Sequence, residues 1–201
     1  MTGRVRMDAH QRLDQIVEQA TDLIAEKGYF GFSIGELAQR CGLSNAGLIH
    51  HIGSKEQVLH LVLDARDRRD AEALGLTDMY AALTGAQSDD ASVDHVVRLL
   101  HDLVAHNATQ PTMIRLYAIL RGEALSAEHP SYAYFRKRDA QAVRAFEAAL
   151  TGYVRNPHAV ARATLALMGG LEEQWLRDPE DVDLVACWDM AFGALLAGSR
   201  I

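Results

Sequence analysis

Cysteine and proline are scarce in this chain, which limits the kinds of scaffold it can form. Its 201 residues include two cysteines and four prolines. Cys41 and Cys187 lie far apart and neither has a second thiol nearby, so the sequence indicates neither a disulfide framework nor a cysteine-based zinc site. The prolines stand near four expected helix starts, where a missing N–H group costs nothing: Pro111, Pro130, Pro157 and Pro179.

Long apolar runs and a surplus of basic residues are also missing. No stretch approaches the roughly 18 uncharged apolar residues of a membrane span, and the chain does not begin like a signal peptide, so we expect a cytoplasmic protein without a membrane partner. The net charge at pH 7 is −7 and the acidic surplus lies mostly in the second part of the chain. A local basic patch near the start remains possible, built from Arg4, Arg6, Arg12, Arg40 and Lys55.

The patterns that the sequence does contain are helical. Hydrophobic residues make up 49% of the chain, and long segments rich in Ala, Leu, Val, Arg and Glu predict an all-α protein. No strand pattern competes with them. The expected helices span residues 8–27, 34–41, 44–52, 55–74, 93–107, 111–125, 130–152, 157–178 and 180–198, and a polar loop is expected at 84–92.

Two short helices near the N-terminus have the spacing of a helix-turn-helix. Such a unit needs a small residue where its helices approach, a turn residue that tolerates positive φ, and an apolar residue returning from the second helix. Ala38, Gly42 and Leu48 have that order. If Leu48 and Ile52 point into a small core, the opposite face can enter a DNA major groove; it carries Asn45, Ala46, Ile49 and His50.

The motif around these helices is similar to that of a known family. The DNA-binding region of TetR-type transcriptional regulators resembles this chain across EKGYFGFSIGELAQRCGLSNAGLIHHIGSKEQVL, residues 26–59. The resemblance implies an all-helical homodimer that binds double-stranded operator DNA through N-terminal domains and a small-molecule inducer through C-terminal domains. We therefore expect a DNA-binding domain at residues 1–58, joined through the long helix at 55–74 to a ligand-binding and dimerisation domain at 59–201.

The resemblance also implies a set of residues that contact DNA. Ile49 and Ile52 depart from the family, which commonly has tyrosine and phenylalanine there, so Ile49 has no hydroxyl to offer a phosphate. Adjacent helical histidines point about 100° apart and cannot readily share one ion, so we expect no metal site at His50 and His51. Lys55, at a helix start, is expected to anchor a phosphate. The predicted contacts are Ser33, Ile34, Arg40, Ser44, Asn45, Ala46, Gly47, Ile49, His50, His51 and Lys55.

The second half of the chain carries weaker signals. LMGGLEEQWLRDPEDVDL, residues 167–184, resembles the C-terminal domains of the betaine-repressor-like subgroup. Apolar stripes on the last two helices could form a four-helix dimer interface. The family resemblance implies this pairing of the terminal helices, and the predicted interface includes Leu165, Val185, Trp188, Phe192 and Leu195. A core stripe within one subunit is the alternative interpretation of the same spacing.

A ligand pocket is expected between the middle helices. Its predicted lining comprises Leu103, His106, Met113, Tyr117, Phe135, Met168, Glu172 and Trp175, although Met and aromatic residues at helical spacing are more often plain core. No catalytic or cofactor-binding motif accompanies them, so neither an enzyme nor a cofactor is expected. The predicted function is a ligand-responsive transcriptional repressor released from a pseudo-palindromic operator by an inducer. Two alternatives stay open: a helical-bundle enzyme or carrier of small molecules, and a DNA-binding regulator without an inducer.

Overall fold

The computed structural model describes residues 8–73 and 92–201, and within those ranges the regular structure is helical except for one antiparallel bridge between Val154 and Arg200. This confirms the predicted all-α class. The helices are α1 (Ala9–Gly31), α2 (Ile34–Arg40), α3 (Asn45–Ile52), α4 (Lys55–Ala73), α6 (Val93–Ala108), α7 (Pro111–Glu123), α8 (Tyr132–Leu150), α9 (Pro157–Arg177) and α10 (Leu184–Ser199).

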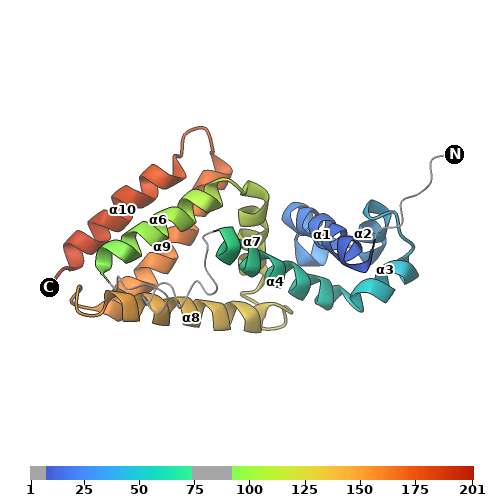
Figure 1. Ribbon diagram of the computed structural model, residues 1–201, viewed down its shortest axis with the longest axis horizontal. Coiled ribbons are helices and arrows are strands. Elements are labelled where there is room, and N and C mark those ends of the chain that lie inside the picture. Colours follow the sequence, from blue (N-terminus) through green and yellow to red (C-terminus); the bar gives the residue numbers. More distant parts are fainter. Residues whose placement is uncertain (1–7, 74–91) are drawn as a thin grey trace.

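The helices are grouped toward the two ends of an elongated molecule (Figure 1). Helices α1, α2 and α3 lie together at one end, α6, α9 and α10 lie at the other, and α4 and α7 lie between them. Among the described residues no helix is both long and apolar enough to cross a membrane. The predicted loop at 84–92 lies almost entirely outside the described residues, as do Arg4 and Arg6 of the predicted basic patch.

Most helix bounds match the prediction, and the main difference concerns two prolines. Pro111 and Pro157 are the first residues of α7 and α9, as expected. Pro130 instead lies two residues before α8, and Pro179 lies five residues before α10. Helix α10 begins later than predicted because Asp183 caps it, accepting a hydrogen bond from the Ala186 N–H group at 3.0 Å.

Two apolar clusters hold the fold together. The first joins α1–α4 to α7 and to the start of α8, and it contains Leu59 and Val62 together with Leu116 and Leu120. It therefore extends across the predicted boundary between residues 58 and 59. The second cluster joins α6, α8, α9 and α10 around the fully buried Trp188.

Candidate DNA-binding interface and domain junction

Capping residues define the two short helices of the N-terminal domain. The Ser33 hydroxyl accepts the Glu36 N–H group at 3.2 Å, and the Ser44 hydroxyl accepts the Gly47 N–H group at 3.0 Å. Gly42 lies in the turn between the helices with φ of +64°, a conformation that favours glycine. The predicted helix-turn-helix geometry is therefore present.

Helix α3 has an inner and an outer face. Leu48 and Ile52 are buried in the first apolar cluster. Asn45 and Ala46 are exposed, and the Ile49 side chain is 39% exposed. The predicted orientation of α3 is thus confirmed, while its contact with DNA remains a prediction.

The histidine pair lies on the exposed end of α3. The rings of His50 and His51 are edge to face with centroids 5.8 Å apart. Across residues 8–73 and 92–201, no three His, Cys, Asp or Glu side chains gather in a way that could hold a metal ion. The pair is therefore available on the surface beside the outer face of α3.

Two arginines expected to form the basic patch are held by other groups of the domain. The Arg40 guanidinium donates to both Glu26 carboxylate oxygens, at 3.1 and 2.6 Å. The Arg12 Nη1 atom donates to the Gln15 side chain at 2.7 Å and to the Cys41 carbonyl at 3.3 Å. Arg40 can therefore meet a phosphate only by leaving or sharing Glu26.

Ser33, Ile34 and Gly47 contribute to the domain's own structure as well as to the predicted contact set. Ser33 is an exposed N-cap, and Ile34 packs partly against the first apolar cluster. Gly47 is half-buried, with its amide engaged by Ser44. Of the predicted contacts, those on the outer face of α3 are the most accessible to DNA.

The contacts of Lys55 favour a structural role over the predicted role as a phosphate anchor. Its ammonium group donates to the Phe32 carbonyl at 2.7 Å and lies 4.7 and 4.4 Å from the ring centroids of Tyr29 and Phe32. Burial lowers the pKa of Lys55, partly offset by the nearby carboxylates of Glu123 and Glu56. The carbonyl after α1 has no helical donor, and Lys55 at the start of α4 supplies one.

Replacing Lys55 with alanine should therefore weaken folding more than DNA contact. Loss of a half-exposed charged hydrogen bond and its ring contacts should lower the free energy of unfolding by about 1 kcal/mol. The salt dependence of DNA binding should stay unchanged because no phosphate contact is lost. A salt slope reduced by about one unit would show instead that Lys55 binds a phosphate.

A break in α1 connects the N-terminal domain to α7. Gly28 has φ of +71° and ψ of 175°, so the predicted helix stop is a kink after which one further turn continues to Gly31. The kink releases the Tyr29 N–H group, which donates to Glu123 Oε2 at 2.9 Å. A methyl group on Gly28 would overlap the Glu123 carboxylate. The positive φ therefore favours glycine at this position, and a side chain there would have to displace the Glu123 carboxylate from the Tyr29 N–H group.

His129 completes this junction from the loop after α7. The ring is buried, with Nε2 located 3.4 Å from Glu123 Oε2. The Ser131 N–H group donates to Nδ1 at 3.2 Å, so the proton of the neutral ring lies on Nε2, which faces Glu123. Burial lowers the pKa of His129, and the attraction of Glu123 offsets only part of this effect.

The lowered pKa of His129 predicts a pH-dependent stability. Above the ordinary imidazole pKa of 6.5 the ring is neutral in the folded and unfolded chain and has no effect. Below it the unfolded chain binds a proton that the folded chain resists, so the free energy of unfolding falls as pH is lowered. Urea titrations at about pH 7.5 and about pH 5.5 should show that the free energy of unfolding falls less for His129→Asn than for wild type. Equal falls would contradict the assignment.

The predicted dimer stripe on α10 needs correction at two positions. Trp188 and Phe192 are 1% and 2% exposed within a single chain, and their rings stack with centroids 4.9 Å apart. They belong to the second apolar cluster and have no surface left for a partner. Leu165, Val185 and Leu195 are half-buried against that cluster. The exposed positions of α10 are other residues: Ala186, Asp189, Met190, Gly193, Ala194, Ala197 and Gly198.

The eight predicted ligand contacts are divided between different parts of the core, and their contact with a ligand stays a prediction. Met113, Tyr117 and Phe135 are buried in the first apolar cluster, whereas Leu103, Met168 and Trp175 pack against the second. Met113, Tyr117 and Phe135 thus fill the space between α7, α8 and α1, as expected if they are core residues. His106 is half-buried on α6.

Glu172 lies in a polar cluster inside the larger domain. Its carboxylate accepts a hydrogen bond from the Asn107 amide at 2.7 Å. Burial raises the pKa of Glu172, and the positive charges of Arg66, Arg121 and Arg138 offset part of that effect. The sequence pattern places Glu172 in the interior but does not reveal these arginines, because they come from three other helices.

The comparisons with known proteins agree with this geometry. The family model of "Bacterial regulatory proteins, tetR family" matches residues 16–62, which include α2 and α3. No curated protein matches the sequence. Residues 16–62 are thus similar to the tetR family of bacterial regulatory proteins.

Similar solved structures extend the likeness to the whole fold. NalD, the secondary repressor of the MexAB-OprM multidrug efflux pump in Pseudomonas aeruginosa, is 21% identical, with 96% of this chain and 98% of that chain covered and a TM-score of 0.69. SmeT in complex with triclosan is 18% identical, with 94% and 92% covered and a TM-score of 0.75; SmeT is the repressor of a Stenotrophomonas maltophilia multidrug efflux pump. AibR, in complex with isovaleryl coenzyme A and operator DNA, is 24% identical, with 92% and 98% covered and a TM-score of 0.64. The chain has the fold of these regulators.

Proposed function

We propose that this chain is a ligand-responsive transcriptional repressor that binds a pseudo-palindromic operator as a homodimer. The observation that carries the proposal is the tetR-type domain at residues 16–62, with the outer face of α3 exposed for a major groove. The relatives bound to triclosan and to isovaleryl coenzyme A support a ligand-responsive larger domain. The stretch at 167–184 favours a betaine-repressor-like scaffold for that domain.

Reading of DNA is assigned to the N-terminal half of α3. Asn45 offers a donor and an acceptor at the first position of the helix, and Ala46 keeps the helix slim enough for close approach. Ile49, on the same face one turn later, can pack on a thymine methyl group. The acidic surplus of the chain lies away from this domain, which limits repulsion of the phosphates.

The junction at Glu123 is the proposed route between ligand and DNA. Glu123 ends α7 and accepts the Tyr29 N–H group at the kink of α1, so a displacement of α7 changes the position of α1. Helix α1 packs on α2 and α4, and it therefore influences the position of α3 in each subunit. A ligand that shifts α7 would alter the spacing of the two recognition helices and weaken operator binding.

The homodimer is proposed to form through the exposed face of α10. Small side chains there, with Met190 at 72% exposure, permit close approach of a second helix. Two such faces related by a two-fold axis would give a self-complementary interface. The interface is thus shifted from the buried stripe that the sequence predicted to the opposite side of the same helix.

Binding of the purified chain to duplex DNA from its own upstream region, measured by fluorescence anisotropy, tests this proposal. The variant Glu123→Gln weakens a charged acceptor for the Tyr29 N–H group and should lower operator affinity about tenfold, because α1 is held less firmly. Glu128→Gln, at an exposed site nearby, should bind like wild type. Absence of operator binding by wild type would reject the function, and unaltered affinity in Glu123→Gln would reject the junction as the route.

A further inference from the structure

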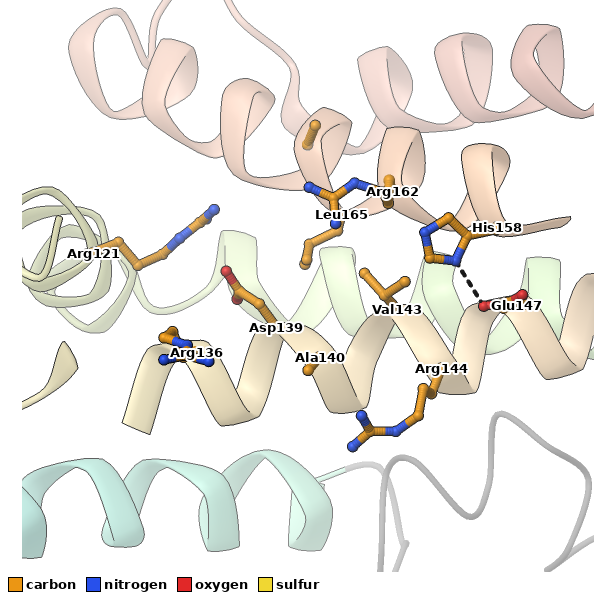
Figure 2. A pocket seen from close by; sticks show the side chains of 11 residues that line it. Arg121, Arg136, Asp139, Ala140, Val143, Arg144, Glu147, His158, Arg162 and Leu165 are labelled. Carbon is orange, nitrogen blue, oxygen red and sulfur yellow. Dashed lines mark hydrogen bonds and ion pairs between the residues drawn. The ribbon is translucent and has the colours of Figure 1, made fainter. Parts of the chain in front are cut away.

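A cleft of about 490 Å³ between α8 and α9 has an unusual lining. Four arginines border it, namely Arg121, Arg136, Arg144 and Arg162, together with the carboxylates of Asp139 and Glu147. Figure 2 shows Arg121 reaching from α7 and Arg162 from α9 toward the side of the cleft where Asp139 of α8 lies, while Arg144 points away. None of the ligand contacts predicted from the sequence lines this cleft.

The charges of the cleft leave a positive surplus. Glu147 is engaged by His158, whose Nδ1 atom lies 2.9 Å from Glu147 Oε2. Arg121 and Arg162 make no ion pair with a carboxylate in the part of the chain that the structure describes. Arg121 lowers the pKa of Glu172 through space but forms no hydrogen bond with it in that part. Two guanidinium groups therefore remain available for an anion, and guanidinium is well suited to bind carboxylate in a forked geometry.

Arg121 lies close to the backbone of α9. Its guanidinium lies against Gly169 of α9, where a methyl group would overlap it. Because Gly169 has no side chain, the Arg121 guanidinium can lie along α9 and reach the cleft.

Asp139 adds a second requirement on the ligand. Its Oδ1 atom is buried and has no hydrogen-bond partner within the described residues. A buried carboxylate oxygen of this kind is costly unless a donor reaches it. Beside it, Val143 and Leu165 give the cleft an apolar wall.

We propose that this cleft binds a small organic carboxylate that also carries a hydrogen-bond donor such as a hydroxyl group. The carboxylate contacts Arg121 and Arg162, the donor meets Asp139, and the apolar part of the ligand lies on Val143 and Leu165. Binding of the carboxylate does not depend on the proposed function; only its effect on DNA binding rests on that function. Arg121 stands two residues before Glu123 on α7. A ligand that binds Arg121 can therefore displace α7, the helix that contacts the kink of α1.

Calorimetric titration of the full chain without DNA tests the ligand class. The probes are mandelate and 3-hydroxyhexanoate, compared with mandelamide, which lacks the charge, and phenylacetate, which lacks the hydroxyl. At least one hydroxycarboxylate should bind, and mandelamide or phenylacetate should bind about tenfold more weakly than mandelate. No binding of either hydroxycarboxylate would overturn the proposal, and so would mandelate binding that mandelamide or phenylacetate equals.

Variants connect the binding to this cleft. Arg162→Gln should weaken binding about tenfold. Arg177→Gln on the same helix, where Arg177 pairs with Glu173 at 3.0 Å on the surface, should leave it unchanged. Asp139→Ala should remove the preference for mandelate over phenylacetate. Binding that Arg162→Gln does not weaken would overturn the assignment of the cleft.

A separate measurement keeps the two proposals distinguishable. Mandelate or 3-hydroxyhexanoate, whichever binds more tightly, is added to the complex of wild type with DNA from its own upstream region. Release of the DNA supports both proposals. Ligand binding without DNA release leaves the cleft assigned and rejects its regulatory role, whereas DNA binding without any carboxylate binding rejects the cleft alone.

Discussion

Replacing Phe192 with alanine should lower the free energy of unfolding by about 3–5 kcal/mol, the usual cost of removing a fully buried aromatic side chain. The ring is stacked on Trp188 in the second apolar cluster, and its loss leaves a cavity between α6 and α10. Chemical denaturation followed by circular dichroism measures the effect. Glu180→Ala, at an exposed position before the same helix, should change stability by about 0.5 kcal/mol or less.

Variants on the two sides of α10 test folding and assembly separately. Met190→Glu places a charge on the exposed face of α10 and should leave the subunit folded while preventing the proposed dimer, because two like charges would meet across the two-fold axis. Analytical ultracentrifugation should find monomers for this variant and dimers for wild type. A Phe192→Ala protein as stable as wild type would contradict the core assignment, and a dimeric Met190→Glu protein would contradict the interface.

Replacing Asn45 with alanine should produce the largest loss of operator affinity. The expected cost is about 1–3 kcal/mol for each half-site, because a bidentate base contact is lost. A dimer loses two such contacts, so the total reaches roughly 2–6 kcal/mol for well-separated half-sites. Affinity for random duplex should fall little, since phosphate contacts are unaltered.

The control for Asn45 lies on the same domain but away from the outer face of α3. Gln19→Ala on α1, at a half-exposed position, should bind operator and random duplex like wild type. If Asn45→Ala weakened binding to both duplexes equally, Asn45 would position the helix on the phosphate backbone without reading bases.

The sequence predicts the helices well because their signals are local. Ser33 and Ser44 cap α2 and α3 at the expected residues, and the spacing of Leu48 and Ile52 gives the buried side of α3. The family resemblance over residues 26–59 implies an all-helical architecture for the remainder of the chain. Local capping also explains why α10 starts late, at Leu184: Asp183 caps it, whereas Pro179 indicates an earlier start.

The sequence predicts contacts between distant residues less well. Lys55 has the expected place at the start of α4, but only the fold shows the Phe32 carbonyl that its ammonium group meets. The α10 stripe is apolar whether it faces its own subunit or a partner, so spacing alone cannot distinguish the two. Likewise, the cleft between α8 and α9 is formed by arginines on three helices, and no sequence motif connects them.

The pairing of Glu123 with the kink of α1 is likewise a property of the fold. Gly28 is visible in the sequence as a helix breaker, but its positive φ can end a helix or kink it. Glu123 lies 94 residues beyond Tyr29, the residue whose N–H group it accepts. Neither residue carries a local pattern that would connect them.

Selection of duplexes from a random pool by the wild-type chain and by Asn45→Ala tests the central claim most directly. The account predicts that wild type selects a pseudo-palindrome with half-sites about one helical turn apart, and that Asn45→Ala selects sequences relaxed at the same position of both half-sites. Selection of no sequence by wild type, or of the same palindrome with the same affinity by Asn45→Ala, would contradict the assignment of α3 as the helix that reads the operator.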